Sequence, residues 1–140
     1  MSFLSSKVEY GILGVLALCL SAGQMSVRSI AEKENLSIRF LEQAMNRLKE
    51  TGLIESVRGS FGGYRLAKEP KSIKLFDVIS AIEGKKKSSS LALSLKPVIL
   101  NEISSGMAVV LEDHLSAIDF ETLARRVRIL QQKEALMFHI

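Results

Sequence analysis

Long apolar stretches and regular apolar spacing run along most of this 140-residue chain and predict a mainly helical protein. Residues 6–20 are apolar over most of their length, so they are expected to form a helix that is buried on most sides. Residues 75–83 repeat apolar side chains at helical spacing and predict another helix, which Gly84 ends.

Two helices joined by a tight turn are predicted between these segments. A short helix over residues 27–34 is expected to begin after Ser26, and a longer helix, capped by Ser37, is expected to reach about Glu50. Asn35 tolerates the left-handed conformation that a tight turn needs. The apolar side chains expected to be buried in this unit are Val27, Ile30, Ala31, Leu36, Ile38, Leu41, Met45 and Leu48.

A small β-hairpin is predicted next. Leu53–Arg58 and Tyr64–Lys68 are short runs of alternating residues on either side of the glycine-rich sequence GSFGG. Two such runs around a glycine-rich loop are typical of antiparallel strands.

The last third of the chain predicts a linker and two helices. Residues 85–96 are rich in lysine and serine and are interpreted as a linker, and a long helix is expected from Pro97 to about Ala117. A final helix is expected after Asp119 as its N-cap, with Phe120, Leu123, Val127 and Leu130 buried. The apolar stripe of the long helix, which one chain would struggle to cover, is formed by Leu100, Ile103, Met107, Val110, Leu111, Leu115 and Ile118.

This order of elements predicts a mainly α fold with a small β-hairpin. Helix, tight turn, helix and hairpin form a winged helix-turn-helix, here expected within residues 1–84. Residues 85–96 would link it to a helical dimerisation region and tail at residues 97–140.

The predicted fold makes DNA the expected partner. The outward face of the second helix of the helix-turn-helix would enter the major groove, where arginine reads guanine, glutamine reads adenine and an aromatic ring packs on a thymine methyl. The capping serine would hold a phosphate, and the arginine and glycines of the hairpin tip would approach the DNA backbone or the minor groove. The candidate DNA-binding residues are Ser37, Arg39, Phe40, Gln43, Asn46, Arg47, Arg58, Gly59, Ser60, Gly62, Gly63 and Tyr64.

Charge and composition limit the kinds of functional site that the chain can form. The formal net charge is +4, and residues 85–96 contain four lysines and no acid. Cys19 is the only cysteine, so it forms no disulfide within the chain and is interpreted as a small core residue. No cluster of acid, base and nucleophile is visible, so we expect no enzymatic activity, and no cofactor or metal.

The apolar run at residues 10–20 could also be taken for the core of a signal peptide. A signal peptide has a positively charged region before its apolar core, but here the charge of Lys7 is cancelled by that of Glu9. Eleven residues are also too few to span a bilayer, which takes about 20. We therefore expect a cytoplasmic protein that does not contact membranes.

Residues 7–84 resemble the IscR/NsrR/CymR family of bacterial winged-helix repressors. The resemblance is carried by the strings SIRFLEQAMNRLKETGLIESVRGSFGGYRLA and LFDVISAIEG. It implies a homodimeric transcription factor, most simply a repressor, in which the long helix after the linker crosses its twin. Many relatives hold an iron–sulfur cluster with three cysteines in the segment that corresponds to residues 85–100. This chain has no cysteine there, so we expect a regulator without a cluster.

The last seven residues, EALMFHI, resemble the C-terminus of the cluster-free, cysteine-metabolism branch of that family. The resemblance implies cysteine synthase as a partner, with the Ile140 carboxylate in its active site and Phe138 and His139 packed at the mouth. A backbone nest that grips an amino-acid carboxylate can also grip a chain terminus. The residues alone leave another interpretation open, in which this tail completes the core around the last helix.

Two alternatives to this function remain at the level of the sequence. One is a cluster-free regulator of another pathway, which would sense a small molecule between the DNA-binding module and the dimer helix. The other is a winged helix that docks on proteins and binds no DNA.

Overall fold

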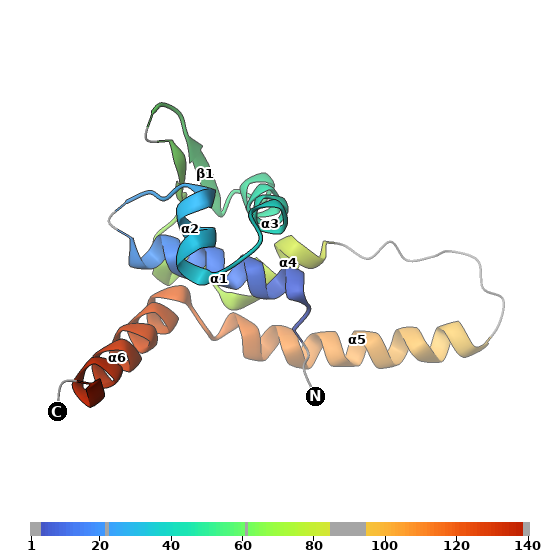
Figure 1. Ribbon diagram of the computed structural model, residues 1–140. Coiled ribbons are helices and arrows are strands. Elements are labelled where there is room, and N and C mark those ends of the chain that lie inside the picture. Colours follow the sequence, from blue (N-terminus) through green and yellow to red (C-terminus); the bar gives the residue numbers. More distant parts are fainter. Residues whose placement is uncertain (1–3, 22, 61, 85–94, 139–140) are drawn as a thin grey trace.

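The computed structural model describes residues 4–21, 23–60, 62–84 and 95–138. Helices dominate it, and one antiparallel pair of strands forms a hairpin that projects from the helical body (Figure 1). In chain order the elements are α1 (Ser6–Leu20), α2 (Val27–Glu34), α3 (Ile38–Glu50), β1 (Ile54–Val57), β2 (Gly63–Leu66), η1 (Pro70–Ser72), α4 (Leu75–Glu83), α5 (Leu95–Ser116) and α6 (Phe120–Phe138).

Helix α1 is the centre of the fold. It contacts α2, α3, α4, α6 and strand β2, which accounts for the nearly continuous apolar sequence of this helix. Two glycines bring its neighbours close, because a Cβ at Gly11 would lie 2.8 Å from a side-chain carbon of Ile82 and one at Gly14 would lie 2.8 Å from the sulfur of Met45. The largest fully buried side chains are Phe120, Ile30, Leu41, Met45, Leu48, Ile54, Ile73, Val8, Val15 and Val78.

The limits predicted from the sequence agree with the structure for the α-helices of the first 84 residues, whereas the short helix η1 was not predicted. The predicted segments 6–20, 27–34 and 75–83 have the bounds of α1, α2 and α4. Ile38 is a correction: its side chain is 39% exposed, because it lies in the first turn of α3, and Ala44 is buried in this helix instead. The strands are also shorter than expected, four residues each, with Ile54 opposite Leu66 and Val57 opposite Gly63.

Helix α5 differs from the prediction at its start. It begins at Leu95, so Leu95 and Lys96 belong to the helix, and Pro97 is its third residue. The rest of the predicted linker, residues 85–94, lies outside the described residues. Much of α5 extends beyond the helical body (Figure 1).

The turn between α5 and α6 is fastened to the segment before α4. The Leu75 N–H donates to the Ile118 carbonyl at 2.8 Å, and the Phe120 N–H donates to the Ile73 carbonyl at 3.0 Å. The Phe120 side chain is fully buried in the core that α1 and α4 share. Residues 118–124 thus pack with the helix-turn-helix body.

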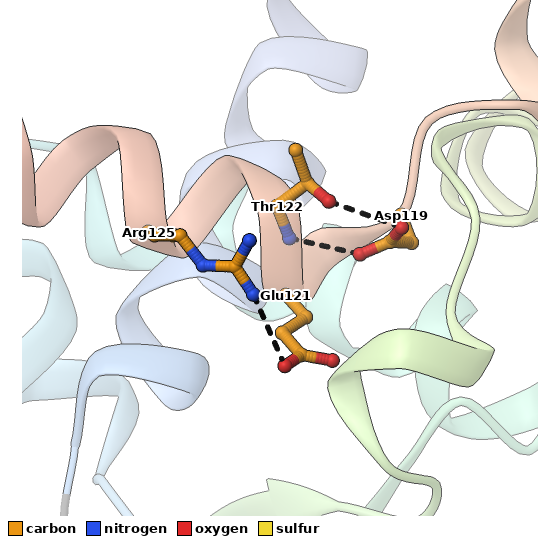
Figure 2. Close-up of polar contacts among 4 residues, drawn as sticks. All are labelled: Asp119, Glu121, Thr122 and Arg125. Carbon is orange, nitrogen blue, oxygen red and sulfur yellow. Dashed lines mark hydrogen bonds and ion pairs between the residues drawn. The ribbon is translucent and has the colours of Figure 1, made fainter.

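The predicted N-cap of α6 is confirmed. Both carboxylate oxygens of Asp119 accept hydrogen bonds from Thr122, one from its backbone N–H at 2.8 Å and one from its hydroxyl at 3.1 Å (Figure 2). The same close-up shows Arg125 pairing with Glu121 one turn apart, at 3.4 Å. Leu130 was expected to be buried, but its side chain is 48% exposed, because it lies in the part of α6 that extends beyond the core.

Among the described helices, none combines the length and apolar character needed to cross a bilayer.

Candidate nucleic-acid interface

Helix α3 has one buried face and one exposed face. Leu41, Ala44, Met45 and Leu48 are buried against the core. The opposite side exposes five of the residues expected to contact DNA, which are Arg39, Phe40, Gln43, Asn46 and Arg47. The helix therefore offers a surface with two guanidinium groups, two amides and one aromatic ring to a partner.

Local capping fixes how α3 leaves the turn. Asn35 adopts the left-handed conformation at φ 55°, and its N–H donates a hydrogen bond to the Ala31 carbonyl in the last turn of α2. The Ser37 hydroxyl accepts a hydrogen bond from the Phe40 N–H at 3.5 Å, as expected of an N-cap. The left-handed turn at Asn35 and the N-cap at Ser37 were both predicted from the sequence.

Tyr10 of α1 also holds the start of α3, a contact that sequence reasoning missed. Its hydroxyl accepts a hydrogen bond from the Ser37 N–H at 3.2 Å, and its ring centroid lies 6.3 Å from that of Phe40. Phe40 remains 53% exposed. The one sequence signal was a tyrosine at the start of the apolar run of this helix, and nothing local linked it to residue 37.

The tip of the hairpin is exposed, and its shape requires glycine. Arg58, Gly59 and Ser60 are all exposed. Gly59 has φ +118°, and its carbonyl accepts a hydrogen bond from the Gly62 N–H at 2.9 Å. A Cβ on Gly62 would lie 2.6 Å from the Val57 carbonyl oxygen. These two glycines close the turn that presents Arg58.

Gly63 and Tyr64 make their contacts inside the fold. A Cβ on Gly63 would lie 2.3 Å from the Met25 carbonyl oxygen, and Tyr64 exchanges two backbone hydrogen bonds with Met25, at 2.8 and 3.0 Å. The Tyr64 hydroxyl donates to the Asn46 side-chain oxygen of α3 at 3.3 Å. Tyr64 is half-buried, and burial, with the nearby Glu42 carboxylate, raises the pKa of its phenol. Both residues join the hairpin to the helix-turn-helix, and a DNA contact by either remains a prediction.

The positive charge of this surface is available to a partner. Arg39, Arg47 and Arg58 are exposed, and none of them lies in an ion pair within the described residues. Arg65, on the other hand, is paired with Glu55 across the two strands. A patch of unpaired guanidinium groups attracts a polyanion such as DNA.

The described residues do not suit an iron–sulfur cluster. They contain no group of three histidine, cysteine or acidic side chains placed to hold a metal ion. Burial raises the pKa of the Cys19 thiol from 9.0 to about 11, although the nearby Arg128 acts in the opposite direction. With one cysteine in the sequence and none in residues 85–100, the chain lacks the set of cysteine ligands that a cluster requires.

The predicted dimer stripe is exposed along α5. Leu100, Ile103, Met107, Val110 and Leu111 are 46–69% exposed, whereas Leu115 and Ile118 are half-buried near the turn. Val98, Ile99 and Val109 on the same helix are also at least half exposed, and the residues of the dimer interface remain a prediction.

The tail does not join the core in this chain. Leu136, Met137 and Phe138 are 69–79% exposed at the end of α6. The interpretation in which these side chains complete the core is therefore wrong for these three residues. His139 and Ile140 lie outside the described residues.

Comparisons with known proteins agree with this architecture. Residues 4–129 match the Rrf2 family, described as "Iron-dependent Transcriptional regulator". Over 83 residues the chain is 40% identical to the HTH-type transcriptional regulator CymR of Bacillus subtilis strain 168, which covers 58% of this chain and 60% of that protein. Over 82 residues it is 40% identical to IscR of Escherichia coli O1:K1, covering 57% of this chain and 51% of that protein. The aligned part thus spans less than two thirds of either relative.

Solved structures resemble the chain over more of its length. The structure of CymR, the global cysteine regulator of B. subtilis, matches with a TM-score of 0.71 and 31% identity, covering 90% of this chain and 98% of that one. The structure of IscR from T. potens matches with a TM-score of 0.68 and 32% identity, covering 90% and 88%. These relatives are named as regulators and not as enzymes. With the family match extending from α1 well into α6, the chain belongs to the Rrf2 family of transcriptional regulators.

Proposed function

We propose that this chain is a homodimeric regulator that binds specific DNA sequences, with α3 in the major groove and the hairpin tip on the flanking backbone. The observation that carries the proposal is the two-sided character of α3. Its apolar face is buried in the core, while Arg39, Gln43 and Arg47 are exposed beside a glycine-shaped hairpin that presents Arg58.

The two kinds of contact have separate roles. Gln43 and Arg39 carry side chains that can each make two hydrogen bonds to one base edge, so they are assigned to base reading. Ser37 lies at the N-terminus of α3 and Arg58 at the hairpin tip, so they are assigned to phosphate or the minor groove. Phe40, Asn46 and Arg47 complete the reading face.

The dimer is proposed to form through α5. Its exposed apolar side chains lie on a helix that extends beyond the body of its own chain, and a second copy offers the same surface. A two-fold pair of helix-turn-helix units binds two half-sites, so the operator is expected to be an inverted repeat.

Anisotropy titration of a labelled random-sequence duplex, at several salt concentrations, separates this function from protein docking. A DNA-binding regulator binds such a duplex at low salt and loses affinity steeply as salt rises, because bound counterions are released. A winged helix that only docks on proteins gives almost no anisotropy change at any salt concentration.

The regulated pathway is proposed to be cysteine or sulfur metabolism, with the chain acting as a repressor. Support comes from its relative, named as the global cysteine regulator, and from the absence of cluster ligands. The exposed Phe138 fits a tail that is available to cysteine synthase. Calorimetric titration of cysteine synthase with a peptide of residues 134–140 tests the partner. Micromolar binding that is lost when the Ile140 carboxylate is amidated supports it, and no binding by either peptide rejects it.

A further inference from the structure

A groove of about 700 Å³ lies where the first turns of α1, the side of α3 and the end of α4 meet. Its apolar part is formed by Tyr10, Phe40, Ala44 and Ile82, which come from all three helices. Pockets for small organic ligands commonly have volumes of about 300–1,000 Å³ and a largely apolar lining with a few polar groups. The volume of this groove lies in that range, and its four apolar residues are joined by six polar or charged ones.

The charged groups of the groove select the charge of its ligand. Lys7 and Arg47 line it from two different helices, and neither forms an ion pair within the described residues. Glu50 lines it too, one turn beyond Arg47, which leaves one net positive charge. A ligand with one negative charge and an apolar body would match both features, because guanidinium and ammonium groups bind carboxylates through charged hydrogen bonds.

The groove overlaps the proposed DNA-reading face. Phe40, Gln43 and Arg47 are assigned to DNA above, and all three line the groove. A molecule seated there would occupy side chains that DNA needs. We propose that this groove binds a small organic anion with an aromatic or aliphatic body, and that this ligand and DNA exclude each other. The exclusion rests on the proposed function, whereas ligand binding does not.

The probe for this site is 2-naphthoate, and neutral 2-naphthamide is the control of nearly the same shape. Methyl NMR of the full chain labelled at alanine and isoleucine follows the titration. The methyl groups of Ala44 and Ile82 report on the groove, and those of Ile99 and Ile103 report on the exposed surface of α5. We expect the shifts of Ala44 and Ile82 to give a Kd for naphthoate that is about tenfold lower than the Kd for naphthamide.

A matched pair of lysine variants tests the charge. Lys7 lines the groove and is not assigned to DNA, whereas Lys133 is an exposed lysine of α6 that does not line it. Lys7→Gln is expected to weaken naphthoate binding by about two- to fivefold, the upper part of the range for one solvent-exposed charged contact, and Lys133→Gln is expected to leave it unchanged. Equal binding of naphthoate and naphthamide, or shifts confined to Ile99 and Ile103, would overturn the proposal.

Competition is measured with the duplex that the chain binds, at constant sodium concentration. At ten times its own Kd, a fully competitive naphthoate raises the apparent Kd for DNA about elevenfold. An unchanged DNA affinity, with the groove methyl groups shifted, would overturn mutual exclusion. If the chain binds no DNA at all, the proposed function fails, and the methyl titration still decides whether the groove takes an anion.

Discussion

The Ser37 N–H donates a hydrogen bond to the hydroxyl of Tyr10, and this links the first turn of the proposed recognition helix to the central helix α1. The same tyrosine ring lies beside Phe40, at a centroid distance of 6.3 Å. An N–H at the start of a helix has no partner within the helix, so α1 supplies one. The orientation of the reading face therefore depends on a residue of the core helix as well as on its own cap.

Replacing Tyr10 by Phe is expected to loosen the start of α3 without unfolding the chain. The substitution keeps the ring and removes one hydrogen bond at a partly exposed site, so the free energy of unfolding should fall by about 0.5–1.5 kcal/mol in urea titrations. Amide exchange at Ser37 should become faster. An unchanged exchange rate at Ser37 would show that the hydroxyl does not hold this turn.

Gly63→Ala is expected to destabilise the junction between the hairpin and the helix-turn-helix. The new Cβ would lie 2.3 Å from the Met25 carbonyl oxygen, which belongs to backbone paired with Tyr64. Overpacking of this kind costs about 1–3 kcal/mol, measured by urea unfolding. Ser60→Ala, at the exposed tip, is the control and should change stability by less than about 0.5 kcal/mol. Equal stability of the two variants would argue against the close contact.

The local and the distant features of the fold differ in how far the sequence predicts them. Ser26, Ser37 and Asn35 act through neighbours three or four positions away, and their roles were predicted because capping is a local property. The contacts of Tyr10 with Ser37 and of Tyr64 with Asn46 join residues 27 and 18 positions apart. No periodicity signals such contacts.

The errors in burial have a related cause. Helical spacing correctly placed Leu41 and Leu48 on the inner face of α3, and it extended the same face to Ile38, where the core no longer covers the helix. Leu130 in α6 is the same case. Spacing defines a face of a helix, but the neighbouring elements decide how much of that face is covered.

Two substitutions separate base reading from backbone contact. Gln43→Ala should cost about 1–3 kcal/mol of discrimination at one base position, whereas Arg58→Ala should weaken binding to all duplexes and reduce the slope of log affinity against log salt by about one. Anisotropy titrations with the preferred and a scrambled duplex measure both, with Lys133→Gln as the control. Equal losses on every sequence for Gln43→Ala would show that the reading face is assigned wrongly.

Dimerisation through α5 predicts that one acidic side chain there separates the protomers. Val110 and Leu136 are both 69% exposed, on α5 and α6, so they form a matched pair. Val110→Glu should shift the light-scattering mass from dimer to monomer, because a carboxylate would be buried without a partner. Leu136→Glu should leave a dimer. A dimeric Val110→Glu variant would place the interface elsewhere.

Cys19 is expected to react slowly with alkylating agents. Because burial raises its pKa to about 11, the thiolate fraction at pH 8 is roughly a hundredfold lower than that of a thiol with the ordinary value. Iodoacetamide labelling followed by mass spectrometry should be slower by at least that factor than in the urea-unfolded chain, and its rate should keep rising as pH approaches 11. Equal rates in the folded and unfolded chain would contradict the burial of this thiol.

Selection of duplexes from a random-sequence pool by the full chain tests the central claim most directly. A dimer that reads DNA through α3 should enrich an inverted repeat, with half-site centres separated by about one helical turn or a multiple of it. Sequencing of the retained pool identifies this repeat. A pool that remains random after repeated rounds, or one that the chain does not retain at low salt, would contradict sequence-specific DNA binding by this protein.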